Sequence, residues 1–267
     1  MTEVAVRTAG AWAGRAVAAP ADTLASRALG ATASKRVAAP SLLSERLLHD
    51  LAEAVRDGDG SGRAEVVREM LASGLRREDI ADFYIPEVAR RLGAAWCDDR
   101  ASFADVSIGV ARLQGLVRMI GPDWFSDAHL DPDAPCILAV VFAGESHTLG
   151  ATLLGAQLGR LGMSVKIVMD RNEARVLDVV ARGKFDAVFL SVSQELQLAA
   201  VKVLVKKIRA VAVKATPVVL GGSVVTRVTD AKTQTGADHA TTDAREALRA
   251  CGLTISTPGA RRRTTSE

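Results

Sequence analysis

The spacing of hydrophobic and polar positions changes near residue 130 and divides the chain into two predicted regions. Between residues 41 and 124, apolar residues recur every three or four positions, which is the spacing of one helix face. The helices predicted in this way cover residues 47–55, 66–71, 78–92 and 103–120. A turn is predicted at 57–62, and Pro86 is expected to kink or split the third helix. Four helices with short links predict a helical bundle.

From residue 136 onward, short continuous apolar runs alternate with amphipathic segments. The predicted strands cover residues 136–143, 164–169, 185–192, 216–220 and 239–242. The predicted helices cover residues 149–161, 173–181, 196–210, 223–235 and 244–251, the fourth with weak helical propensity. Continuous apolar strands alternating with helices specify a parallel sheet that is covered on both faces. We therefore predict an α/β protein in which an N-terminal four-helix bundle precedes a flavodoxin-like, doubly wound, parallel five-stranded sheet.

Four segments follow from this pattern. Residues 1–40 form an Ala/Arg-rich leader, either a flexible tail or an amphipathic transit-like or partner-binding segment that uses Trp12. Residues 41–128 form the helical-bundle cap, and residues 135–253 form the flavodoxin-like domain. Residues 254–267 are expected to be a disordered tail with a solvated basic triplet.

Composition narrows the possible functions. A formal net charge of +3 argues against a basic surface for direct DNA binding, and 4% aromatic residues argue against a stacking platform for single-stranded nucleic acid. The three cysteines are widely separated, which favours neither a disulfide framework nor a zinc site and suits a reducing compartment. The longest apolar runs are too short to cross a bilayer, and no secretory segment is evident. We therefore expect a cytoplasmic protein without membrane partners.

Polar loops follow three of the predicted strands. The loop after the first strand reads Gly-Glu-Ser-His-Thr-Leu-Gly from residue 144 to 150. The third strand ends in Ser191-Val-Ser193, and Gly221-Gly222 follows the fourth. Because parallel strands place their carboxyl ends together, all three loops are expected at one edge of the sheet, where such folds bind ligands.

These loops resemble the pattern of the cobalamin-binding domain in methionine synthase and in corrinoid methyltransferase partners. The matching residues are Glu145-x-His147-x-x-Gly150, then Ser191-x-Ser193, then Gly221-Gly222. The resemblance implies base-off, His-on cobalamin, in which His147 ligates cobalt and the displaced benzimidazole enters the domain. The full predicted cofactor-binding set is Trp96, Glu145, Ser146, His147, Thr148, Leu149, Gly150, Ser191, Ser193, Gly221 and Gly222, with His147 as the metal ligand.

The resemblance also assigns roles to single residues. Glu145, where the family has an Asp whose side chain is shorter by one methylene, would fix the tautomer of His147. Gly150 would admit the nucleotide tail near the helix start, and Ser191 would hydrogen-bond the benzimidazole. Ser193 stands where Leu is usual. The alternative is that His147 is an ordinary polar loop residue of a cofactor-free domain.

The predicted bundle carries a further family feature. In related proteins a Gly-x-x-Trp segment lies over the upper face of the corrin, and Gly93-Ala-Ala-Trp96 matches it. Plain packing within the bundle is the alternative for Trp96. Where cobalamin photoreceptors carry a Glu-His pair after this tryptophan, the chain has Val106-Ser107. That departure puts the same upper-face chemistry in doubt, so hydroxo- or aquocobalamin, methylcobalamin and adenosylcobalamin all remain candidate cofactors.

Three classes of function remain. We find no P-loop, zinc spacing or nucleophile elbow, so we do not expect an enzyme. The chain resembles the AerR/PpaA-type photosynthesis-gene regulators, which implies a light-responsive antirepressor that binds a transcriptional repressor of the PpsR/CrtJ type. A corrinoid carrier for methyl transfer and a cofactor-free signalling domain are the alternatives. For the regulator, we expect cobalamin to lie between the bundle and the sheet and to order their relative placement.

Overall fold

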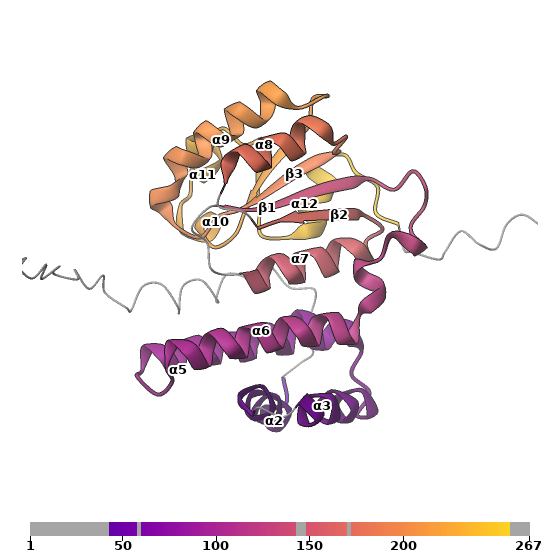
Figure 1. Ribbon diagram of the computed structural model, residues 1–267, viewed down its shortest axis with the longest axis vertical. Coiled ribbons are helices and arrows are strands. Elements are labelled where there is room, and N and C mark those ends of the chain that lie inside the picture. Colours follow the sequence, from indigo (N-terminus) through magenta and orange to yellow (C-terminus); the bar gives the residue numbers. More distant parts are fainter. Residues whose placement is uncertain (1–42, 58–59, 143–147, 170–171, 257–267) are drawn as a thin grey trace, which may run out of the picture.

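A computed structural model describes residues 43–57, 60–142, 148–169 and 172–256 of the chain. The predicted leader and most of the predicted tail lie outside these ranges. The described residues form stacked layers, with a helical bundle on one side, then the helical layer on one face of the sheet, the sheet itself and the helices on its other face (Figure 1). In the part of the chain that the structure describes, no helix combines the length and the apolarity that crossing a bilayer requires.

All five strands of the sheet are parallel. They are β1 (Cys136–Val141), β2 (Ser164–Val168), β3 (Ala187–Ser191), β4 (Val218–Gly221) and β5 (His239–Ala240). Their spatial order is β2-β1-β3-β4-β5, the order of flavodoxin-like sheets. The predicted α/β fold class is confirmed, although β5 keeps only two of the four predicted residues.

The helices of this region cover both faces of the sheet. One face packs against α8 (Glu173–Arg182), α9 (Leu198–Val211), α10 (Val224–Arg227) and α11 (Ala231–Thr235). The other face packs against α7 (Thr148–Arg160) and α12 (Ala244–Ala250). The single helix predicted over residues 223–235 was wrong, because Val228 leaves the helical region at φ −116° and ψ 107° and separates α10 from α11.

The bundle contains α2 (Glu45–Arg56), α3 (Gly60–Ala72), the short α4 (Arg77–Asp79), α5 (Ile85–Cys97) and α6 (Phe103–Ile120). The turn predicted over residues 57–62 was too long, because α3 already begins at Gly60. A glycine is tolerated more easily in the first turn than in a helix interior, since the first amides have no partner within the helix.

Pro86 splits the third predicted helix, as expected. Its ring would clash with the carbonyl of the residue four positions earlier, and it has no amide hydrogen to donate there. The chain responds with a π-helical turn, Ile80–Tyr84, in which the amide of Ile85 donates to the carbonyl of Ile80, five positions back. The proline therefore divides the helix into α4, the π turn and α5 without breaking its path.

The bundle packs directly against α7 (Figure 1). Leu149, Leu153 and Ala156 of α7 belong to the hydrophobic core of the bundle. Close approach is possible because Gly159 has no side chain: a Cβ there would lie 1.9 Å from the carbonyl oxygen of Trp124, in the short helix Pro122–Phe125. The bundle and the sheet therefore share α7 as a common layer.

A polar anchor reinforces this contact, and we call it the Asp82–Arg160 anchor. Both carboxylate oxygens of Asp82, in the π turn, accept hydrogen bonds of 2.8 Å from Nη2 of Arg160 at the end of α7. Nε2 of Gln157 donates a third, of 3.1 Å, to Oδ1 of Asp82. The Arg160 guanidinium also lies 4.4 Å from the ring centroid of Trp124. The side chain of Arg160 is only 15% exposed, so the carboxylate of Asp82 compensates the burial of its positive charge.

We expect Asp82→Ala to lower the free energy of unfolding by about 2–3 kcal/mol, because the largely buried guanidinium of Arg160 then loses its charged partner. The matched control is Asp178→Ala, which removes the partner of Arg182 in an exposed ion pair of α8. That control should change stability by about 0.5 kcal/mol or less. Urea unfolding of both variants measures the difference, and equal losses would contradict a special role for the anchor.

Candidate functional site

The carboxyl ends of β1, β3 and β4 form one row. Val141 pairs with Ser191, and Ser191 pairs with Gly221 in the next strand. The segments that follow these strands therefore leave the sheet at the same edge, as the strand-end argument requires.

The structure places only some of the predicted residues. Glu145, Ser146 and His147 lie outside the described residues, so the predicted metal ligand is not located. Thr148, Leu149 and Gly150 form the first turn of α7. Within the described ranges, no group of three or more His, Cys, Asp or Glu side chains is arranged to hold a metal ion.

A groove opens at this edge between α7 and α12, over the ends of β3 and β4, and contains a cavity of about 110 Å³. Its inner wall is apolar and includes Leu154, Phe189, Val219 and Ala247. Four of the predicted residues, Gly150, Ser191, Gly221 and Gly222, line it. The groove therefore combines an apolar interior with a small-residue entrance, which suits a flat apolar group that has polar attachments.

Glycine is favoured at positions 221 and 222 for different physical reasons. At Gly222, φ is +86° and a Cβ would lie 2.3 Å from the carbonyl oxygen of Val192, so the backbone itself requires glycine. At Gly221, the nearest atom to a Cβ is the carbonyl oxygen of Thr241, at an ordinary 3.5 Å. A side chain at Gly221 is therefore sterically tolerable to the protein, and it would fill space that lies in the groove.

Sequence reasoning missed the opposite rim of the groove, which consists of Thr241, Thr242 and Asp243. Asp243 caps α12 by accepting hydrogen bonds of 2.8 and 2.9 Å from the amides of Arg245 and Glu246. These residues follow β5, so the strand-end rule also applies to them. The sequence pattern that could have identified them was weak, because β5, the strand that precedes them, has only two residues.

Ser193 lies beside the groove rather than in its lining. Its carbonyl oxygen accepts hydrogen bonds from Oγ of Ser223, at 3.2 Å, and from the guanidinium of Arg227. The amide of Val192 also donates to the carbonyl of Gly221, at 3.1 Å. These contacts hold the loop after β3 against the loop after β4 and so fix one side of the site.

The start of α7 faces the bundle. Leu149 is 4% exposed and packs in the core of the bundle, while the hydroxyl of Thr148 accepts a 2.6 Å hydrogen bond from Nε2 of Gln114. Gln114 is eleven positions after Phe103, the first residue of α6, roughly 16 Å at the helical rise. The α5–α6 turn therefore projects beyond the N-terminal end of α7 (Figure 1), and we call this projection the overhang.

Trp96 lies in the overhang and is not among the described residues that line the groove. Its ring meets that of Phe103 edge to face, with centroids 5.8 Å apart. Trp96 is half-buried, whereas Phe103 is 66% exposed and Ile108 49% exposed. The overhang thus presents apolar side chains to solvent at the end of the bundle nearest the start of α7.

Two cysteines near the sheet are neutral thiols at physiological pH. Burial raises the pKa of Cys251, after α12, to about 11, and the negative charge of Asp238 acts in the same direction. Burial also raises the pKa of Cys136 at the start of β1. Since the thiolate is the reactive and metal-binding form, neither thiol suits nucleophilic or metal chemistry.

Comparisons with known proteins agree with this fold. The B12 binding domain family matches residues 135–252. A curated protein from Rhodobacter capsulatus, described as an uncharacterized 20.5 kDa protein in the bchF-crtJ intergenic region, is 34% identical over 175 residues. That alignment covers 66% of this chain and 91% of the relative.

Among solved structures, the monomethylamine corrinoid protein of Methanosarcina barkeri is similar in fold, with a TM-score of 0.61 at 18% identity. The match covers 78% of this chain and 97% of that protein, so the likeness extends beyond the sheet region. On the family match and on the extent of the Rhodobacter capsulatus alignment, the chain belongs to the B12-binding domain family.

Proposed function

We propose that the chain is a cobalamin-binding transcriptional antirepressor of the cytoplasm, without catalytic activity of its own. The observation that carries the cofactor part is the groove between α7 and α12, at the strand ends of the region that the B12 binding domain family matches. The regulatory part rests on the relative encoded between bchF and crtJ. The proposed partner is a repressor of the PpsR/CrtJ type.

The groove suits the nucleotide tail of base-off cobalamin. Its apolar wall of Leu154, Phe189 and Ala247 would receive the benzimidazole, and Gly221 leaves the space that the ring requires. The hydroxyl of Ser191 at the rim would hydrogen-bond the ring, and that of Thr241 would bind the polar part of the tail. His147 would be the lower ligand of cobalt, oriented by Glu145 through its second ring nitrogen.

Entry of the tail requires the groove to widen. A cavity of about 110 Å³ is smaller than the roughly 300–1,000 Å³ of typical small-molecule pockets. We infer that α12 is the moving wall, because it has only seven residues and its N-cap bonds are local to Asp243. By contrast, α7 is buried between the bundle and the sheet and cannot move without disturbing both.

The overhang would cover the upper side of the cofactor. Bound cobalamin supplies a cobalt centre whose upper ligand exchanges and, when it is an alkyl group, is lost in light. Trp96 and Phe103 would form an apolar cover, and neither Val106 nor Ser107 offers a strong cobalt ligand. A water, hydroxide, methyl or adenosyl ligand is therefore compatible with this face.

The signal would be a local change rather than a rearrangement of whole domains. The Asp82–Arg160 anchor holds the bundle on α7 at the end remote from the overhang, and the shared core holds it along α7. A cofactor that fills the space beneath the overhang would shift the α5–α6 turn about this fixed end. The population of turn positions that the repressor can bind would change with the upper ligand.

The first expected result concerns the lower ligand. The purified chain should bind hydroxo-, methyl- and adenosylcobalamin, with absorption spectra of the base-off, His-on state, and light should convert the two alkyl forms. His147→Ala should abolish the His-on spectrum, while the control His49→Ala, on the exposed face of α2, should leave it unchanged. Spectra of the dark and illuminated proteins provide the measurement. Failure of every cobalamin to bind would sink the proposal, and an unchanged His147→Ala spectrum would remove His147 as ligand.

The second expected result separates the two glycines. Gly221→Val should leave thermal stability close to that of the wild type and weaken cobalamin binding by about tenfold or more, because the side chain occupies the groove. Gly222→Ala should instead lower the free energy of unfolding by about 1–3 kcal/mol through backbone strain and overlap with Val192. Thermal unfolding and spectral titration measure both effects. Normal cobalamin affinity in a folded Gly221→Val protein would contradict the assignment of the groove.

The third expected result concerns the partner. A purified repressor of the PpsR/CrtJ type should bind the cobalamin-loaded chain more tightly than the apoprotein, and illumination of an alkylcobalamin form should change that affinity. Pull-down and calorimetry in darkness and in light measure it. A methyl-transfer assay with candidate acceptor enzymes tests the carrier alternative. Binding of the repressor that is independent of cobalamin would favour the cofactor-free alternative instead.

A further inference from the structure

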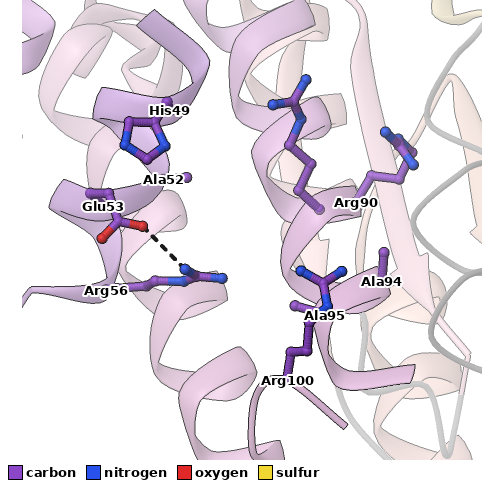
Figure 2. A pocket seen from close by; sticks show the side chains of 9 residues that line it. His49, Ala52, Glu53, Arg56, Arg90, Ala94, Ala95 and Arg100 are labelled. Carbon is purple, nitrogen blue, oxygen red and sulfur yellow. Dashed lines mark hydrogen bonds and ion pairs between the residues drawn. The ribbon is translucent and has the colours of Figure 1, made fainter. Parts of the chain in front are cut away.

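A second pocket lies in the bundle, between α2 and α5, with a volume of about 310 Å³. The two helices leave a hollow between them because the residues on their facing sides are small, namely Ala52 on α2 and Ala94 and Ala95 on α5. Figure 2 shows longer polar side chains around this hollow, on both helices and beyond the end of α5. The pocket is separate from the groove at the sheet edge and shares none of its lining residues.

The side chains around this pocket are mostly cationic. Four guanidinium groups line it, together with the imidazole of His49 and a single carboxylate, that of Glu53. The four guanidinium groups are those of Arg56, Arg90, Arg91 and Arg100. Arginine presents planar N–H donors that match the oxygens of phosphate and carboxylate groups. The lining chemistry therefore points to an anionic ligand.

Two of these arginines are held in place by acids outside the pocket. Both Nε and Nη2 of Arg90 donate to Glu87, at 2.8 and 2.7 Å. Arg91 donates through Nε to Glu87, at 2.9 Å, and through Nη2 to Glu45, at 2.8 Å. These bonds fix the two guanidinium groups on the wall formed by α5 and occupy two of the five N–H donors of each.

The other two arginines keep most of their donors. Arg56 contacts Glu53 only through Nη1, at 3.1 Å, and Arg100 contacts Asp98 only through Nη2, at 2.6 Å. Their guanidinium groups come from opposite sides of the pocket, from the end of α2 and from the α5–α6 turn (Figure 2). A ligand with two anionic groups can therefore be held by both.

The position of Arg100 is fixed by its backbone. The amide of Arg100 donates to the carbonyl of Ala95, at 2.8 Å, and that of Asp99 donates to the carbonyl of Trp96, at 3.1 Å. Asp99 has a left-handed φ of 55°, so these two bonds form a Schellman cap at the end of α5. The cap therefore fixes the backbone position of Arg100 at the rim of the pocket.

We propose that this pocket binds a small soluble polyanion that carries at least two phosphate or carboxylate groups. The volume, at the lower end for ligand pockets, limits the ligand to a compact molecule. Arg56 and Arg100 bind it directly, and Arg90 and Arg91 supply a fixed positive field. Because Arg100 lies between Trp96 and Phe103 in the chain, the bound anion ties the overhang to the end of α2.

Isothermal titration with inorganic pyrophosphate and, separately, with citrate tests this at constant ionic strength in phosphate-free buffer. The full chain should bind at least one probe, and preference between them distinguishes a phosphate ligand from a carboxylate ligand. The double variant Arg56→Gln/Arg100→Gln should weaken binding by about tenfold or more. The control Arg118→Gln/Arg182→Gln removes the same net charge from exposed helix positions elsewhere and should bind as the wild type does.

A second variant, Ala94→Glu, adds a carboxylate to the wall without altering the arginines, and it should also weaken binding. Circular dichroism establishes that each variant is folded. Absence of binding by both probes to the wild type would overturn the proposal. So would unchanged affinity in Arg56→Gln/Arg100→Gln, or an equal loss in both double variants, which would indicate a general charge effect. None of these measurements involves cobalamin, so the result is independent of the proposed function.

Discussion

The structure depends on one constraint, which is that α7 is buried on two faces at once. Leu149, Leu153 and Ala156 contact the bundle, whereas Leu158 packs with the sheet. A helix in this position has little tolerance for polar groups, because an unpaired polar group without water is costly. Most of the polar groups that α7 carries are therefore paired, notably Thr148 with Gln114 at one end and Nη2 of Arg160 with Asp82 at the other, whereas Nη1 of Arg160 is buried without a hydrogen-bond partner among the described residues. The same helix forms a wall of the groove, so packing and the candidate site are set by the same residues.

The position of α7 also divides the bundle into a fixed and a free end. The π turn enforced by Pro86 brings Asp82 to Arg160, and the short helix after α6 places Trp124 against the same guanidinium. At the other end, α6 continues past the start of α7 and carries exposed apolar side chains. The arginine pocket adjoins that free end through Arg100.

Sequence patterns predicted the sheet well for a physical reason. Parallel strands buried on both faces are continuous apolar runs, and their order follows from short crossover connections. The docking of the bundle on α7 was not predictable in the same way. Asp82 and Arg160 are 78 positions apart and resemble any surface charges in the sequence. An alternation of Leu, Ala and Gly in α7 is also what a helix buried on one side would show.

The residues of the candidate site that belong to a sequence motif could be predicted. The residues that only the geometry of the fold brings to the site could not. Ser191, Gly150 and Gly221 line the groove, and their motif identified them. The rim at Thr241 and Asp243 follows a strand too short to give a clear pattern. Gly221 and Gly222 look alike in sequence, and only the distances to neighbouring carbonyl oxygens distinguish them. The backbone requires glycine at Gly222, whereas a side chain at Gly221 would be tolerated and would occupy the groove.

The shared helix has a consequence for cooperativity. The region that the B12 binding domain family matches begins at residue 135, after the bundle. The bundle nevertheless covers Leu149, Leu153 and Ala156 of that region, so the two segments bury each other's apolar surface. Cutting there would leave an apolar stripe in water on one fragment and an open core on the other, both prone to self-association. In thermodynamic terms the unit that unfolds together is larger than the unit that sequence families recognise. Loss of order in the bundle would therefore reach the groove at the sheet edge through the loosening of α7.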